Sequence, residues 1–110
     1  MRIRKDNDYL LEEEILLVSQ VSDALAHPAR IKIYQYIMKC NKDRIPVCNK
    51  DVVNEFDYSQ STISQHINKL CRSGLVQMQK NDKCSMYYAN IGVLMKYLDA
   101  TKKFSTFNAR

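Results

Sequence analysis

The sequence has few of the residues that interrupt regular structure: two glycines and two prolines among 110 residues, and no tryptophan. This scarcity excludes a collagenous, linker-like or low-complexity chain. No apolar run approaches the length of a membrane span, and the first eight residues are charged where a signal peptide needs an apolar core. We therefore expect one cytoplasmic domain without membrane contact. Its four cysteines are expected to be reduced thiols, metal ligands or redox switches and not structural disulfides.

Signatures of catalysis are also missing. The sequence contains no glycine-rich phosphate loop, no nucleophile motif in a supporting context and no pair of carboxylates set against an apolar pattern. We expect neither an enzyme nor a bound cofactor. Positive charge, in contrast, is in excess: 17 Lys and Arg against 12 Asp and Glu give a formal charge of +5 and a pI of about 9.1. This excess favours an acidic partner such as nucleic acid.

Apolar spacing predicts a mainly helical chain with one small β-hairpin. The pair His27-Pro28 separates the first two helices, because proline disfavours helix at the preceding residue but suits the first position of the next helix. Ser59 is expected to cap the fourth helix and Gly74 to end it in the left-handed conformation. The expected elements are helices over 9–25, 28–38, about 50–56, 60–72 and 91–103, an edge strand over 45–47, and hairpin strands over 75–79 and 84–89.

The order of these elements indicates a single domain with short ends. Asn49 and Asn90 are expected to cap the third and the last helix. We expect a flexible basic N-terminus over 1–8, a folded domain over 9–103 and a C-terminal tail over 104–110. Two short helices followed by a hairpin are typical of a winged helix-turn-helix, here in the order α-α-β-α-α-β-β-α.

The fourth helix carries polar side chains opposite its apolar face. If Ile63 and Ile67 face the core, small hydroxyl and amide side chains lie on the other side and its flanks. Glutamine and asparagine can pair with adenine in the major groove of double-stranded DNA, and serine and threonine can contact bases or phosphates. The candidate DNA-binding residues of this helix are Ser59, Gln60, Ser61, Thr62, Ser64, Gln65, Asn68 and Lys69.

The tip of the predicted hairpin offers a second candidate contact. Lys80 and Lys83 bracket the tip and are placed to reach phosphates or a minor groove, although Asp82 weakens the local positive field. Lysines at a hairpin edge also serve to discourage aggregation. Both interpretations of the two lysines stay open at this stage.

Four segments resemble the ArsR/SmtB family of bacterial transcriptional repressors. They are ALAHPARIKI at 24–33, YSQSTISQHINKL at 58–70, SGLV at 73–76 and MYY at 86–88, in the order and at the approximate spacing of that family. The resemblance implies a homodimer joined through the first and last helices, with recognition helices in successive major grooves of a partly palindromic operator. It also implies that residues 60–62, 64 and 65 read or brace DNA.

The family's metal sites are not reproduced. Many members respond to a metal through a Cys-x-Cys pair at the start of the third helix or through acidic and histidine ligands on the last helix. This chain has Cys48 followed by Asn49 and Lys50 at the first place, and no histidine at the second. We therefore expect no metal site, and the small effector is left unknown.

A thiol switch is one alternative for regulation. Cys40 and Cys48 flank a polar loop over 39–47, and the nearby lysines favour a reactive thiolate. A second alternative for function is a winged helix that binds another protein, with the polar helix face as ordinary solvated surface. The absence of acidic residues from Ser59 to Arg72 favours DNA over that alternative. RNA binding is disfavoured, because it calls for aromatic residues on an exposed sheet and at most one of the adjacent Tyr87 and Tyr88 can face outward.

Overall fold

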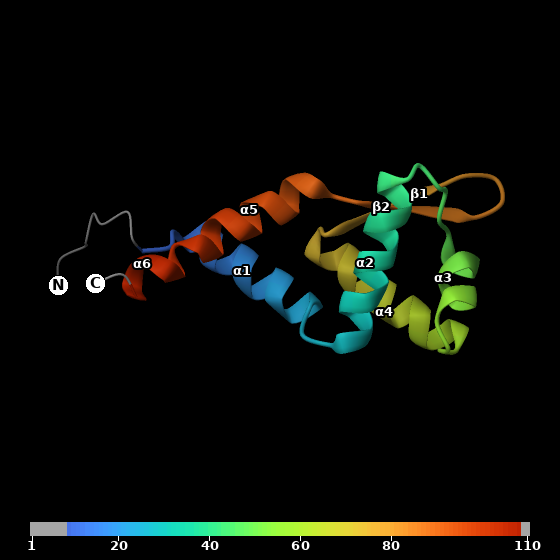
Figure 1. Cartoon of the computed structure of the whole chain (residues 1–110), viewed down its shortest axis with the longest axis horizontal. Helices are drawn as coiled ribbons and strands as arrows, with labels where there is room; N and C mark the ends of the chain where they lie inside the picture. Colours follow the sequence, from blue (N-terminus) through green and yellow to red (C-terminus); the bar gives the residue numbers. More distant parts are fainter. Residues whose placement is uncertain (1–8, 109–110) are drawn as a thin grey trace.

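The computed structural model describes residues 9–108, which form a mainly helical domain with one two-stranded sheet (Figure 1). This confirms the predicted class and the predicted order of the helices and the hairpin. Segments 1–8 and 109–110, parts of the predicted ends, lie outside the described residues. The elements are α1 Glu12–Ala24, α2 Pro28–Lys42, α3 Asn49–Glu55, α4 Gln60–Ser73, β1 Val76–Lys80, β2 Ser85–Ala89, α5 Ile91–Lys102 and α6 Phe104–Asn108.

Local hydrogen bonds explain where most helices begin and end. The side chains of His27, Ser59 and Asn90 each accept a backbone N–H two or three residues further on, and they cap α2, α4 and α5. Pro28 takes the first position of α2, where its missing N–H leaves no bond unmade. Gly74 ends α4 with φ of 89°, a left-handed conformation that favours glycine.

The start of α3 differs from its prediction. Asn49 is the first residue of the helix, and the cap is Cys48. The Cys48 backbone N–H donates to the Asp51 carboxylate at 2.8 Å, and the Cys48 thiol donates to the same carboxylate at 3.2 Å. An acidic residue three positions after the cap satisfies the free backbone donor, as in a capping box. The Asn49 side chain is therefore available for contacts elsewhere.

Helix α2 is longer than predicted. It continues through 39–42, one turn beyond the expected end at Met38, and the expected loop over 39–47 shortens to 43–47. An ion pair between Lys39 and Asp43, with 3.1 Å from Nζ to Oδ2, supports this last polar turn.

Strands β1 and β2 form the wing, an antiparallel hairpin (Figure 1). A single bridge between Cys48 and Met86 joins the segment before α3 to this hairpin. In the same place the Tyr87 N–H donates to the Val47 carbonyl oxygen at 3.0 Å. The predicted edge strand over 45–47 is thus limited to one contact at its end. These two backbone contacts connect the wing to the start of α3.

The core lies where α1, α2, α3 and α4 meet the wing. Ile63 and Ile67, the predicted inner face of α4, are both buried. Each such aliphatic side chain stabilises the fold by about 1.5–3 kcal/mol through burial. The largest fully buried side chains are Ile33, Ile37, Ile63, Leu70, Leu75, Val21, Val47, Val52 and Val76.

Helices α1, α5 and α6 form the end of the molecule opposite the wing (Figure 1). Helices α1 and α5 pack against each other, and an ion pair of 2.8 Å joins Glu14 to Lys103 at their outer ends. Residues 104–108 form α6, which the sequence pattern did not predict. Several large apolar side chains of these helices stay exposed: Leu11, Ile15, Leu16, Ile91, Met95, Leu98, Phe104 and Phe107. Within the described residues, no helix is both long and apolar enough to span a membrane.

Candidate nucleic-acid interface

Helices α3 and α4 and the wing surround the candidate site. Helix α4 follows α3 after a short turn over 56–59, and its outer face is polar. Six of the eight predicted residues of this helix region have exposed side chains, namely Ser59, Gln60, Ser61, Gln65, Asn68 and Lys69. The two others, Thr62 and Ser64, are half-buried. The structure therefore brings the predicted set onto one helix but gives its members different surroundings.

The first turn of α4 uses two of the predicted residues for its own cap. The Ser59 hydroxyl accepts the Thr62 N–H at 3.2 Å and donates to the Thr62 hydroxyl at 3.0 Å. These two side chains hold the helix start. Gln60 and Ser61 stand beside them with exposed side chains.

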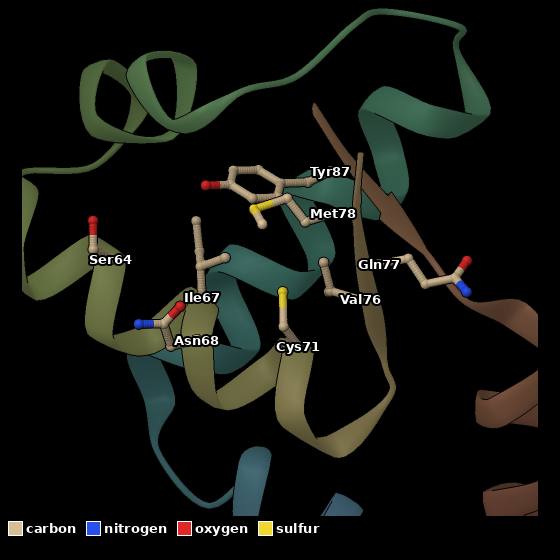
Figure 2. A pocket seen from close by; sticks show the side chains of 8 residues that line it. All are labelled: Ser64, Ile67, Asn68, Cys71, Val76, Gln77, Met78 and Tyr87. Atoms are coloured by element: carbon tan, nitrogen blue, oxygen red, sulfur yellow. The ribbon is translucent and has the colours of Figure 1, made fainter. Parts of the chain in front are cut away.

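Ser64 faces the interior side of the site. The Asn49 amide nitrogen lies 3.4 Å from the Ser64 hydroxyl and 3.5 Å from the Tyr87 hydroxyl, so one side chain of α3 links α4 to β2. Figure 2 shows Ser64, Ile67 and Cys71 of α4 on one wall of a cavity of about 400 Å³ beside Tyr87. Sequence reasoning assigned Asn49 to a cap and so missed this bridge.

Lys69 already has a partner within the chain. Its Nζ lies 3.4 Å from the Asp23 carboxylate at the end of α1. Both side chains are largely exposed, so this ion pair contributes little to stability. The pair does, however, set the position of the Lys69 ammonium group on the edge of α4.

The wing presents both predicted lysines to solvent. Lys80 and Lys83 have exposed side chains on either side of the tip. The tip is shaped by Asn81, whose side-chain oxygen accepts the N–H groups of Lys83 and Cys84 at 3.0 and 2.9 Å. This Asx-type turn was not predicted, although asparagine at a hairpin tip is a known signal for it. It fixes the backbone that carries Lys83.

His66 lies in an aromatic and basic cluster behind the outer face of α4. Its ring is 4.8 Å from the His27 ring and 6.3 Å from the Tyr58 ring, measured between centroids. The Arg30 guanidinium lies 3.4 Å from His66 Nδ1 and also donates to the Ala24 carbonyl at 2.7 Å. Arg30 thus ties the end of α1 to α4. Sequence reasoning quoted it only as part of a motif.

The pKa of His66 is lowered by burial, and the charges of His27 and Arg30 lower it further. The folded state therefore resists protonation of this ring more than the unfolded state does. We expect the free energy of unfolding to fall as the pH falls through the unfolded pKa of 6.5. In urea titrations at about pH 7 and about pH 5, His66→Gln should lose less stability than the wild type. Equal losses in the two proteins would contradict this assignment.

The predicted pair of cysteines has a different environment from the one expected. Cys40 and Cys48 are both buried. Burial raises the pKa of Cys48, and its hydrogen bond to Asp51 raises it further. Burial and a hydrogen bond with Cys40 raise the pKa of Tyr36 to about 12. A thiol switch made of Cys40 and Cys48 stays a prediction.

Known proteins similar to this chain point to one family. The sequence model of the bacterial regulatory proteins of the arsR family matches residues 27–78, the stretch from the cap of α2 into β1. An arsenical resistance operon repressor from Staphylococcus xylosus is 30% identical over 73 residues. That match covers 66% of this chain and 65% of the repressor, just under two thirds of its length.

Solved structures share the fold. An ArsR-like transcriptional regulator from a Rhodococcus species aligns with a TM-score of 0.72 at 21% identity, covering 84% of this chain and 82% of the other. The homodimeric winged helix-turn-helix DNA-binding domain of a possible ArsR-family regulator from Mycobacterium bovis aligns with a TM-score of 0.65 at 17% identity, covering 89% and 84%. These likenesses confirm the winged helix-turn-helix fold. Over residues 27–78 the chain is similar to the bacterial regulatory proteins of the arsR family.

Proposed function

We propose that the chain is a cytoplasmic, dimeric transcriptional repressor that binds a palindromic operator in double-stranded DNA. One observation carries this proposal: α4 and the wing place an uninterrupted polar and basic surface side by side. No acidic residue occurs between Asp57 and Asp82, a stretch that contains all of α4 and β1. Along this stretch of the sequence, no acidic side chain repels a polyanion before Asp82 at the wing tip.

The exposed apolar side chains of α1, α5 and α6 support a homodimer through these helices. A small domain rarely leaves so many large apolar side chains in water on one end. The Mycobacterium bovis neighbour is itself described as homodimeric. With a two-fold axis at this end, we expect the two α4 helices to enter successive major grooves, as a palindromic operator requires.

Gln65 is the side chain on α4 that we expect to read a base. It is exposed in the middle of the outer face, one helical turn after Ser61. Gln65→Ala should relax the base preference at one operator position, with a loss of about 1–3 kcal/mol for the preferred base. Binding to a panel of single-base operator variants measures this effect. An unchanged preference at every position would mean that another face of α4 points into the groove.

Lys83 is expected to act differently, because a lysine at the wing tip contacts phosphates and not bases. Lys83→Ala should weaken binding to all sequences alike and reduce the slope of log affinity against log salt by about one. Titrations of one specific and one random duplex at several salt concentrations test this expectation. A loss confined to the specific duplex would assign Lys83 to base recognition.

Selection on random duplex DNA tests the proposed function as a whole. The purified chain is incubated with the library at several salt concentrations, with and without reductant. Enrichment of an inverted repeat, with affinity that falls steeply with salt, is the expected result. If the folded protein enriches no sequence, the alternative of a protein-binding winged helix takes precedence. If DNA is released only in oxidised protein, a thiol-responsive repressor is favoured.

A further inference from the structure

The last turn of α2 is joined to the wing by the side chain of Asn41. Its amide nitrogen donates to the Tyr87 carbonyl oxygen at 3.3 Å, and its amide oxygen accepts the Ala89 N–H at 2.7 Å. Alternate residues of a strand direct their backbone groups to the same side, so both bonds lie on the edge of β2 that faces away from β1. We call these two hydrogen bonds the Asn41 clamp.

The end of α2 is closed without the Asn41 side chain. The Ile45 N–H donates to the Cys40 carbonyl oxygen at 2.8 Å, and the Arg44 N–H donates to the Asn41 carbonyl oxygen at 3.1 Å. Arg44 adopts the left-handed conformation, with φ of 60°, that this type of helix ending requires. These bonds fix the backbone of Asn41, and its side chain is therefore available to hold β2.

Tyr87 connects the Asn41 clamp to α4. Its carbonyl oxygen accepts from Asn41, its N–H donates to Val47 at 3.0 Å, and its hydroxyl lies 3.5 Å from the Asn49 amide nitrogen. The same nitrogen lies 3.4 Å from the Ser64 hydroxyl on α4. Figure 2 shows the Tyr87 hydroxyl on the side of the cavity where Ser64 lies. A series of contacts thus extends from α2 through β2 to α4.

We propose that Asn41 is a positioning residue for DNA binding, which sets the angle of the wing against α4 and so brings Lys80 and Lys83 to the phosphates of the duplex. This inference rests on the proposed function. Asn41 acts through the wing and not by contact with DNA, because it is half-buried and both polar groups of its side-chain amide are bonded to β2.

The length of the wing makes its tip sensitive to a small change at the Asn41 clamp. Strand β2 extends from Ala89 at the clamp to Ser85 beside the tip, about 14 Å at about 3.4 Å per residue. A tilt of about 10° at the clamp therefore moves the tip by about 2 Å. A direct hydrogen bond between a lysine and a phosphate does not survive a displacement of this size. Both lysines of the wing should lose their contacts together.

The angle of the wing can be measured without DNA. Residual dipolar couplings of backbone amides report the orientation of β1 and β2 relative to α4. In Asn41→Ala, the couplings of both strands should change while those of α4 keep their wild-type fit, and the Ala89 amide should exchange with solvent at least about tenfold faster. Alanine favours helix more than asparagine does, so α2 keeps its last turn. Gln35→Ala removes an exposed amide from the same helix and should match the wild type.

Salt titrations of DNA binding separate positioning from a simple loss of stability. Under conditions where every variant is folded, Asn41→Ala should weaken binding to specific and random duplexes alike, by about five- to tenfold. The slope of log affinity against log salt should fall by about one to two. Because the displaced wing no longer brings Lys83 to a phosphate, adding Lys83→Ala to Asn41→Ala should cause little further loss. A protein that is only destabilised keeps the full effect of Lys83→Ala.

The outcomes distinguish the role of Asn41 from the proposed function. Independent, additive losses in the double variant, or a wild-type salt slope in Asn41→Ala, would overturn the positioning role. Unchanged dipolar couplings of the two strands in Asn41→Ala would overturn it as well. A wild-type chain that binds no duplex would contradict the proposed function alone, since the couplings decide in the absence of DNA whether Asn41 sets the angle of the wing.

Discussion

Replacing Leu98 by lysine is expected to separate the proposed dimer into monomers and to lower the affinity for a two-half-site operator by about a hundredfold or more. Leu98 lies on α5 among the exposed apolar side chains of α1, α5 and α6, and 47% of it is exposed in the single chain. A charge there has to lose its water when a second copy covers it, which opposes association. A monomer binds each half-site separately and loses the gain from linking them.

Sedimentation and DNA titration together check this prediction. The variant should sediment as a monomer, bind a single half-site like the wild type and lose only the gain from the second half-site. Lys102→Ala, an exposed polar position on the same helix, is the matched control and should remain dimeric. A Leu98→Lys protein that stays dimeric would place the interface on another surface.

Ile63→Ala is expected to lower the free energy of unfolding by about 2–5 kcal/mol. Ile63 is fully buried on the inner face of α4, where its side chain packs in the core. Removing most of that side chain leaves a cavity that the surrounding helices cannot fill completely. Chemical denaturation with an unchanged dependence on denaturant measures the loss.

Ser61→Ala, on the outer face of α4, is expected to change DNA affinity but not stability. Its side chain is exposed two residues before Ile63, so stability should change by no more than about 0.5 kcal/mol. Its effect should instead be on DNA affinity. If Ser61→Ala destabilised the fold as strongly as Ile63→Ala, the assignment of inner and outer faces of α4 would be wrong.

Much of the fold follows from signals that are local in the sequence. Pro28 at the first position of α2, Ser59 as the cap of α4 and Gly74 at its end were all predicted, because each acts on neighbours within four residues. The inner face of α4 was predicted from the spacing of Ile63 and Ile67. In each of these cases the interacting residues lie within about one helical turn of each other, so the sequence pattern alone is sufficient to predict the structure.

Other features depend on partners distant in the chain and could not be predicted in this way. Cys48, before α3, is joined to Met86 of the wing by a backbone bridge between two segments that are distant in the sequence. Asn49 does not cap α3 as predicted, because Cys48 is the cap and its N–H donates to Asp51. Helix α6 is too short to be stable by itself, so apolar spacing did not indicate it.

The ion pair between Lys69 and Asp23 makes the end of α1 a competitor of the operator. To reach a phosphate, the Lys69 ammonium group has to leave the Asp23 carboxylate, 3.4 Å away. A lysine that exchanges one anion for another releases fewer salt ions than a free lysine. Lys69 should therefore contribute less than a free lysine to the slope of log affinity against log salt. It also links operator occupancy to the helix on which the proposed dimer is built.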